Sequence, residues 1–153
     1  MEKLEIKHLA PYLPNGFVNV LVNDGNLKYI DYITSISLID ECISFDKSQD
    51  WYYGEGEDEI NIKPIFRPLS NLTKEIEING KIFVPAKVLW SVEAKEEEDF
   101  DVYGIIPEYW KNNMKLNPIK YYNYRDMERL FKWHFDVFGL IEKGLAIDIK
   151  TLK

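Results

Sequence analysis

The amino-acid sequence predicts a single α+β domain over residues 1–153, in which antiparallel strands are packed by a C-terminal amphipathic helix. Two observations carry this prediction. Short β-rich runs in the N-terminal half are separated by turn-forming Asn-Gly and Asp-Gly steps. Near the C-terminus, apolar residues recur instead at helical spacing. A chain of 153 residues with 46% hydrophobic residues is long enough to bury a core.

The first part of the chain is predicted to form a short helix and three strands. Glu2–Ala10 favours a helix that Pro11 and Pro14 bring to an end. Strands are expected at Phe17–Val22, Lys28–Ile39 and Cys42–Phe45. The first two would form a hairpin around the turn Asn23–Asn26. The polar, glycine-bearing stretch Ser48–Glu59 is predicted to be a loop.

The middle of the chain is predicted to contain a strand at Ile60–Phe66, placed at a sheet edge because Pro64 lacks a backbone N–H. Ser70 is expected to cap a short helical turn over Asn71–Glu75. Asn79-Gly80 then predicts a tight hairpin between the strands Glu75–Ile78 and Lys81–Val84.

After this hairpin, Pro85 is expected to change the chain direction, and another element begins within Val88–Val92. The segment Glu93–Asp101 holds six acidic residues and two apolar ones. It offers little to bury, so we expect an exposed acidic loop there.

The C-terminal helix is predicted over Asn123–Phe138. Asn123 suits the N-cap position, and Asp126 would lie near the positive end of the helix dipole. Gly139 is a natural stop residue after the last turn. The predicted buried face comprises Met127, Leu130, Phe131, His134, Val137, Phe138 and Ile141.

The net charge of −7 is concentrated in the middle of the chain. Residues 40–101 hold 16 acidic and 7 basic residues, whereas residues 102–153 are mildly basic. An acidic surface repels nucleic-acid phosphate and favours a basic partner surface, such as that of a nucleic-acid enzyme. A solvated acidic face that keeps a small protein soluble explains the same charge equally well.

Composition also bounds the cellular setting. No apolar run approaches the ~20 residues of a transmembrane helix, and Met1–Lys7 precedes no apolar signal-peptide core. We therefore expect a cytoplasmic protein that does not contact membranes. The single Cys42 cannot form an intrachain disulfide and is expected to be a small buried side chain.

No motif in the sequence predicts a catalytic centre, so we expect neither an enzyme nor a bound cofactor. The patterns HExxH, GxSxG, GxGxxG and the P-loop are absent. On a continuous helix, His134 would face the core and Asp136 would point elsewhere, so the two would not form a dyad. Carboxylates of Gly54–Glu59 could hold Ca²⁺ or Mg²⁺, but their spacing is not that of an EF-hand, and no metal site is predicted.

Two segments are predicted to contact a partner. The acidic one comprises Glu55, Glu57, Asp58 and Glu59. The other interleaves aromatic with basic residues, namely Tyr103, Tyr109, Trp110, Lys111, Lys115, Lys120, Tyr121 and Arg125. Such mixtures form hot spots in protein interfaces, and they also stack on bases and contact phosphate in single-stranded RNA. Ordinary packing onto the core is a third explanation.

Two further segments carry a family resemblance. Ile62–Ile76 reads IKPIFRPLSNLTKEI, and Trp133–Asp148 reads WHFDVFGLIEKGLAID. Together they resemble small proteins encoded by bacterial phages and prophages, a family that brings no catalytic residues to carry over. The opening His8–Pro14 is similar in kind, whereas Glu93–Asp101 is not part of the pattern.

This resemblance implies a setting in an infected bacterial cell. Small acidic phage proteins often bind host proteins, and one type is the anti-CRISPR inhibitor, including inhibitors of the RNA-targeting nuclease Cas13b. The resemblance therefore implies a non-catalytic protein that binds a host defence nuclease or its RNA complex. The alternatives are a phage housekeeping or virion-associated protein and a small RNA-binding protein.

Overall fold

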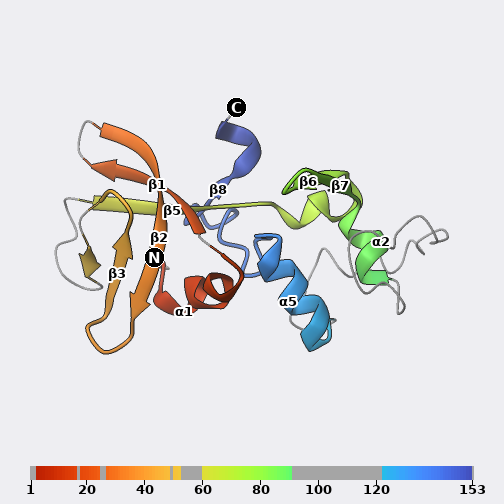
Figure 1. The fold of residues 1–153 in the computed structure, drawn as a ribbon. Helices are drawn as coiled ribbons and strands as arrows, with labels where there is room; N and C mark the ends of the chain where they lie inside the picture. The colour runs from red at the N-terminus through yellow and green to blue at the C-terminus, as the bar shows by residue number, and fades with distance from the viewer. Residues whose placement is uncertain are drawn as a thin grey trace. The chain divides into compact units, whose positions relative to one another are not determined.

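The computed structural model describes residues 3–16, 18–24, 27–48, 50–52, 60–90 and 122–152. It confirms the predicted α+β class (Figure 1). The chain divides into two compact units, which are described in turn. Met1–Arg67 and Phe138–Lys153 form the first, here called the sheet unit, and Pro68–Val137 forms the second, called the helix unit. The prediction of one domain over residues 1–153 stays a prediction.

The sheet unit contains six strands in the order β4-β3-β2-β1-β5-β8. All neighbouring strands are antiparallel except β5 and β8, which are parallel. The strands are β1 (Val18–Asp24), β2 (Leu27–Ser37), β3 (Cys42–Phe45), β4 (Trp51–Tyr52), β5 (Ile60–Phe66) and β8 (Ile147–Asp148). Strands β1, β2 and β3 are thus adjacent in the sheet and consecutive in the chain, as in two successive hairpins.

The β1–β2 hairpin confirms the sequence prediction, and its side chains follow the two-residue period of a half-buried sheet. Val18, Val20 and Val22 are fully buried on one face of β1. In the same register, Val18 lies opposite Ile33 of β2, which is also fully buried. The predicted strand at Cys42–Phe45 is confirmed as β3, and Cys42 is buried as expected.

Two predictions about this sheet are wrong. β5 lies between β1 and β8 rather than at an edge, although β8 pairs only with Ile65 and Phe66, beyond Pro64. The missing N–H of Pro64 therefore costs no bond to β8. Within the predicted loop Ser48–Glu59, Trp51–Tyr52 forms the short strand β4 against β3. Residues 53–59 of that loop lie outside the described residues.

The N-terminal segment closes one side of the sheet unit's core. Helix α1 (Ile6–Leu9) is shorter than predicted and continues as the 3₁₀ helix η1 (Ala10–Asn15), which contains both Pro11 and Pro14. A 3₁₀ helix tolerates these prolines because few of its N–H groups are needed. Tyr12 is fully buried and stacks on Phe66, with ring centroids 4.4 Å apart.

The chain end returns to the sheet unit and packs against this segment. The rings of Phe138 and His8 lie 5.5 Å apart. Nδ1 of His8 accepts a 3.1 Å hydrogen bond from the backbone N–H of Glu5, so this histidine caps α1. The chain then forms β8 and ends in the 3₁₀ helix η4 (Ile149–Leu152).

The helix unit combines a two-stranded sheet with helices. Its described elements are η2 (Leu69–Thr73), β6 (Ile76–Ile78), β7 (Lys81–Phe83), α2 (Pro85–Trp90) and α5 (Tyr124–Lys132). The Asn79-Gly80 hairpin is confirmed, and φ angles of 52° and 79° are those of a type I′ turn. Pro85 begins α2, where its fixed φ suits the first turn. The predicted Ser70 cap is wrong, because Ser70 lies inside η2 and Pro68 precedes that helix.

The core of the helix unit is an apolar cluster to which each of its described helices and strands contributes. Its largest member, Trp133, is 1% exposed and lies 5.1 Å from the ring of Phe83. The buried members are Leu72, Ile76, Phe83, Ala86, Val88, Leu89, Leu130, Trp133, Phe135 and Val137. Of the predicted buried face, Leu130 lies in this cluster, and Met127 and Phe131 pack against it. The rest of that prediction is wrong for Phe138 and Ile141, which belong to the sheet unit because α5 ends at Lys132. Trp133, which the prediction left out, is buried in their place.

The predicted end of α5 at Phe138 is wrong, because the helix stops at Lys132. His134 takes a left-handed φ of 55°. Its N–H donates to the carbonyl of Phe131 at 3.0 Å, and the N–H of Phe135 donates to the carbonyl of Leu130 at 3.0 Å. These two bonds are the Schellman arrangement that ends a helix, here with His in the position that Gly usually takes. His134 and Asp136 therefore lie beyond the helix, and the predicted separation of their side chains around a continuous helix is wrong in its premise.

Candidate interaction surface

Most residues predicted to contact a partner lie outside the described residues. This is so for Tyr103, Tyr109, Trp110, Lys111, Lys115, Lys120, Tyr121, Glu55, Glu57, Asp58 and Glu59, and for the acidic segment 93–101. Arg125 is described. It lies in the first turn of α5, where its Nε is 3.6 Å from Oδ1 of Asp126. Whether these residues form one surface stays a prediction.

The described residues instead bring forward a carboxylate that the sequence did not single out. Asp31 lies in the middle of β2 and is only 1% exposed. Its neighbour across the sheet is the fully buried Val20. An aspartate at a core position of a central strand loses its hydration, which is costly unless other donors replace water.

Four groups supply those donors. The N–H of Tyr32 donates to Oδ1 at 2.8 Å, and the N–H groups of Lys47 and Ser48 donate to Oδ2 at 3.1 and 2.8 Å. The hydroxyl of Ser48 also donates to Oδ2. The chain leaving β3 thus wraps around the carboxylate, and we call Asp31 together with these four donors the Asp31 cradle.

The cradle sets the charge state of its carboxylate. Burial alone would raise the pKa of Asp31, but the hydrogen bonds from the Ser48 hydroxyl and from the backbone of Tyr32, Ser48 and Lys47 outweigh it and lower the pKa. An ionised carboxylate that already accepts from four donors is a poor general base, because its lone pairs are occupied. The cradle therefore serves the structure by fixing the chain between β3 and β4.

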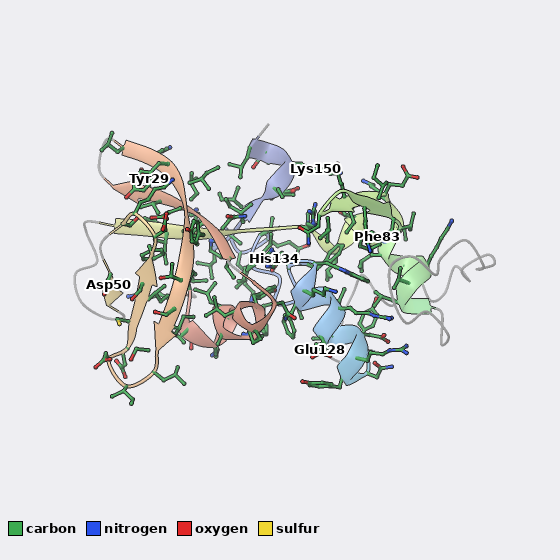
Figure 2. All side chains as sticks on the ribbon, in the orientation of Figure 1. Tyr29, Asp50, Phe83, Glu128, His134 and Lys150 are labelled. Carbon is green, nitrogen blue, oxygen red and sulfur yellow. The ribbon has the colours of Figure 1, made fainter. Side chains whose placement is uncertain are left out.

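Two tyrosines of β2 extend this polar cluster. The hydroxyl of Tyr29 lies 3.0 Å from the hydroxyl of Ser48. Tyr32 hydrogen-bonds through its hydroxyl to Asp46, and this bond is the first cause of its raised pKa. Figure 2 shows Tyr29 on β2 and Asp50 beside β4. Together these contacts bind β2 to the segment that follows β3.

The other end of β2 carries the second notable feature, the turn Ser37–Glu41, here called the hairpin tip. Oγ of Ser37 donates to Oδ2 of Asp40 at 2.7 Å and accepts from the N–H of Asp40 at 3.1 Å. Glu41 then takes a left-handed φ of 50° before β3 begins. In Figure 1 the tip projects beyond the paired part of β2 and β3. These reciprocal bonds give the turn a defined conformation.

The hairpin tip exposes two adjacent aliphatic side chains. Leu38 is 73% exposed and Ile39 is 94% exposed. Single exposed hydrophobic residues are ordinary, but two neighbours on a projecting, hydrogen-bonded turn form a contact point. Sequence analysis does not reveal it, because the predicted strand Lys28–Ile39 includes both residues, whereas β2 ends at Ser37. The signal that could have revealed it was the run Ser37-Leu38-Ile39-Asp40, in which Ser and Asp are placed to close a turn.

The helix unit contains a second buried carboxylate, Asp126, which is 7% exposed. Asn123 caps α5 as predicted, since its Oδ1 accepts from the N–H of Asp126 at 2.9 Å. Burial raises the pKa of Asp126, while Arg125 and Arg129 act in the opposite direction. The guanidinium of Arg129 also donates to the carbonyl of Val88 at 3.2 Å, which joins α5 to α2.

Within the described residues, no group of three or more His, Cys, Asp or Glu side chains is placed to hold a metal ion. None of the helices there is long and apolar enough to cross a membrane. In comparisons with known proteins, the chain matches no family model, no curated protein and no solved structure.

Proposed function

We propose that this protein acts by binding another protein, and that in the cytoplasm of an infected bacterium it inhibits a host defence nuclease. The observation that carries the binding part is the hairpin tip. The side chains of Leu38 and Ile39 are mostly exposed to solvent, on a turn closed by Ser37 and Asp40. Folding gains little from these two side chains, whereas a partner would gain from burying them.

The architecture behind the tip supports this reading. β2 is held on one side by β1 and on the other by β3, and the Asp31 cradle fixes the chain that leaves β3. A turn whose backbone is already held by strand pairing and hydrogen bonds needs little further ordering on binding, so more of its interaction energy contributes to affinity. The geometry therefore favours recognition of a partner over chemistry on a substrate.

The choice of a nuclease as the partner rests on the resemblance of Ile62–Ile76 and Trp133–Asp148 to phage proteins and on the acidic charge. A net charge of −7 favours the basic channel of a nucleic-acid enzyme over nucleic acid itself. The specific case that the resemblance suggests is the RNA-guided effector Cas13b.

The test is an RNA-cleavage assay with purified Cas13b, its guide RNA and a labelled target RNA. Excess wild-type protein should suppress cleavage, and the double variant Leu38→Ser with Ile39→Ser should relieve that suppression. The matched control is Leu27→Ser, because Leu27 is 65% exposed at the opposite end of the same strand. Full cleavage in excess wild-type protein would exclude Cas13b as the target.

A further inference from the structure

We propose that the hairpin tip inserts into an apolar pocket whose rim is basic, on the surface of a protein partner. This inference rests on the proposed function only in that the partner is a protein; it does not require the partner to be a nuclease. Its elements are the aliphatic pair Leu38 and Ile39 and the acidic pair Asp40 and Glu41.

The aliphatic pair defines the centre of the contact. Ile39 is the most exposed large hydrophobic residue of the described part of the sheet unit, and Leu38 is next. The turn that carries them is closed by bonds between Ser37 and Asp40, so the two side chains are presented without further ordering of the backbone. A narrow, pre-shaped apolar projection fits a pocket better than a flat surface.

The acidic pair defines the rim. Asp40 and Glu41 follow Ile39 directly, and both are exposed. No Lys or Arg occurs between Lys28 and Lys47, so the hairpin arms bring no cation of their own to the tip. Lysine or arginine side chains around the pocket would pair with these carboxylates and orient the insertion.

The same charges argue against two other occupants. A bacterial membrane surface is anionic and attracts basic segments, so it would repel a tip that carries Asp40 and Glu41. A second copy of the chain, docked tip to tip, would bring four carboxylates together around the apolar contact. Like charges across an interface weaken the encounter and cost binding energy.

The test places a photoreactive benzoylphenylalanine at residue 39 of the full chain, with residue 27 as the matched control position. After irradiation in lysate of a bacterium that carries a related prophage, protein adducts are identified and the crosslinked peptide is mapped. Supporting results are an adduct formed from residue 39 and not from residue 27, mapped to an apolar surface with Lys or Arg beside it.

Capture alone does not suffice, so the charge is tested on the same adduct. Glu41→Lys should lower the adduct yield by about 3- to 10-fold, and Glu41→Gln should lower it less. Leu38→Ser should lower it by about 10-fold or more through lost apolar contact. Glu41 is chosen because Asp40 closes the turn, and circular dichroism of each variant checks that the sheet is retained.

Four outcomes overturn the proposal. They are the absence of any protein adduct from residue 39, an adduct with a second copy of the chain, flotation of the protein with phosphatidylglycerol–phosphatidylethanolamine vesicles, and a yield unchanged by Glu41→Lys. Because adduct formation needs no nuclease activity, the inference can hold where Cas13b is not inhibited. Conversely, inhibition of Cas13b that survives Leu38→Ser and Glu41→Lys would leave the proposed function standing and remove the tip from it.

Discussion

Asp31 of the sheet unit and Asp126 of the helix unit are both buried, yet their surroundings shift their pKa values in opposite directions. Asp31 accepts hydrogen bonds from three backbone N–H groups and one hydroxyl, and its pKa is lowered. Oδ1 of Asp126 has no hydrogen-bond partner among the described residues, the Nε of Arg125 lies 3.6 Å from it, and the pKa of Asp126 is raised. Both carboxylates are buried, but they differ in the hydrogen-bond donors that surround them.

The cost of a buried charge therefore depends on how the chain folds around it. The segment after β3 turns so that consecutive N–H groups point at Asp31, and this replaces the water that was lost. Asp126 lies in the first turn of α5, where the helix dipole and two arginines favour its charge but do not fully offset burial.

The two residues therefore make opposite contributions to the pH dependence of stability. A lowered pKa in the folded state means that Asp31 stabilises the fold above its ordinary pKa of 3.8, and this is lost as the pH falls through the folded value. A raised pKa means that Asp126 binds its proton more readily when folded. Its ionisation therefore removes stability as the pH rises from 3.8 through the raised folded value.

The largest expected effect comes from Asp31→Asn. An asparagine keeps one acceptor but turns an NH₂ group toward N–H donors, so at least one of Lys47 and Ser48 loses its partner. We expect a loss of about 3–5 kcal/mol in the free energy of unfolding at pH 7, measured by urea denaturation. Hydrogen exchange should show faster exchange at residues 47 and 48 than elsewhere in the sheet.

The matched control for this change is Asp50→Asn, because Asp50 is exposed just before β4. It should alter the free energy of unfolding by no more than about 0.5 kcal/mol. If Asp31→Asn were as mild as this control, the cradle would contribute nothing to stability and the comparison with Asp126 would fail.

The second prediction asks what stabilises the helix unit, where the buried charge is poorly satisfied. Leu130 of α5 is fully buried in the apolar cluster, so Leu130→Ala should cost about 3 kcal/mol through lost burial and the cavity left behind. Phe131 is only partly buried, so Phe131→Ala should cost less despite removing a larger side chain. Urea denaturation of both variants gives the comparison, and a larger loss for Phe131→Ala would contradict it.

Local sequence signals predicted the elements well where one residue decides the geometry. Asn79-Gly80 supplies two left-handed residues for a hairpin, and Asn123 supplies the acceptor for a helix N-cap. The end of α5 was predicted wrongly, because Gly139 is the expected stop residue and His134 took that role. Burial of Phe135 and Leu130 on either side of the stop holds His134 in a conformation that its own preference would not have chosen.

The candidate site was harder to predict, because it depends on residues far apart in the chain. Asp31 sits within alternating strand residues, and nothing local indicates that Lys47 and Ser48 would wrap around it. The hairpin tip was hidden for another reason. Leu38 and Ile39 continue an apolar pattern, which predicts burial, whereas the reciprocal bonds of Ser37 and Asp40 turn the chain and expose them.

The third prediction concerns the N-cap of α5, where Asn123 binds the backbone N–H of Asp126. Asn123→Ala removes the acceptor for the N–H of Asp126, and it should cost about 1 kcal/mol in the free energy of unfolding. Asn123→Ser, which keeps a capping oxygen, should retain most of that energy. Equal losses in the two variants would show that the side chain of residue 123 does not act as a cap.

The smallest expected effect comes from Asp126→Asn, which tests directly whether Asp126 and Asp31 differ in how well their charges are stabilised. The change removes a buried charge that its neighbours do not fully satisfy, while the backbone N–H that Asn123 caps is kept. We expect the free energy of unfolding at pH 7 to rise by up to about 1 kcal/mol, whereas Asp31→Asn should lower it. This increase in the free energy of unfolding should shrink as the pH falls toward 3.8. At low pH the wild-type carboxyl is itself protonated when folded, so the variant no longer removes a buried charge.

Urea denaturation of both aspartate variants between pH 4 and pH 7 measures this sign directly. Glu128→Gln is the control on the same helix, since Glu128 is exposed and its substitution should change the free energy of unfolding by no more than about 0.5 kcal/mol. If Asp126→Asn were destabilising by as much as Asp31→Asn, Arg125 and Arg129 would satisfy the carboxylate as well as the cradle does. Burial with only nearby cations would then be equivalent to burial with aligned N–H donors, and the distinction between the two aspartates would disappear.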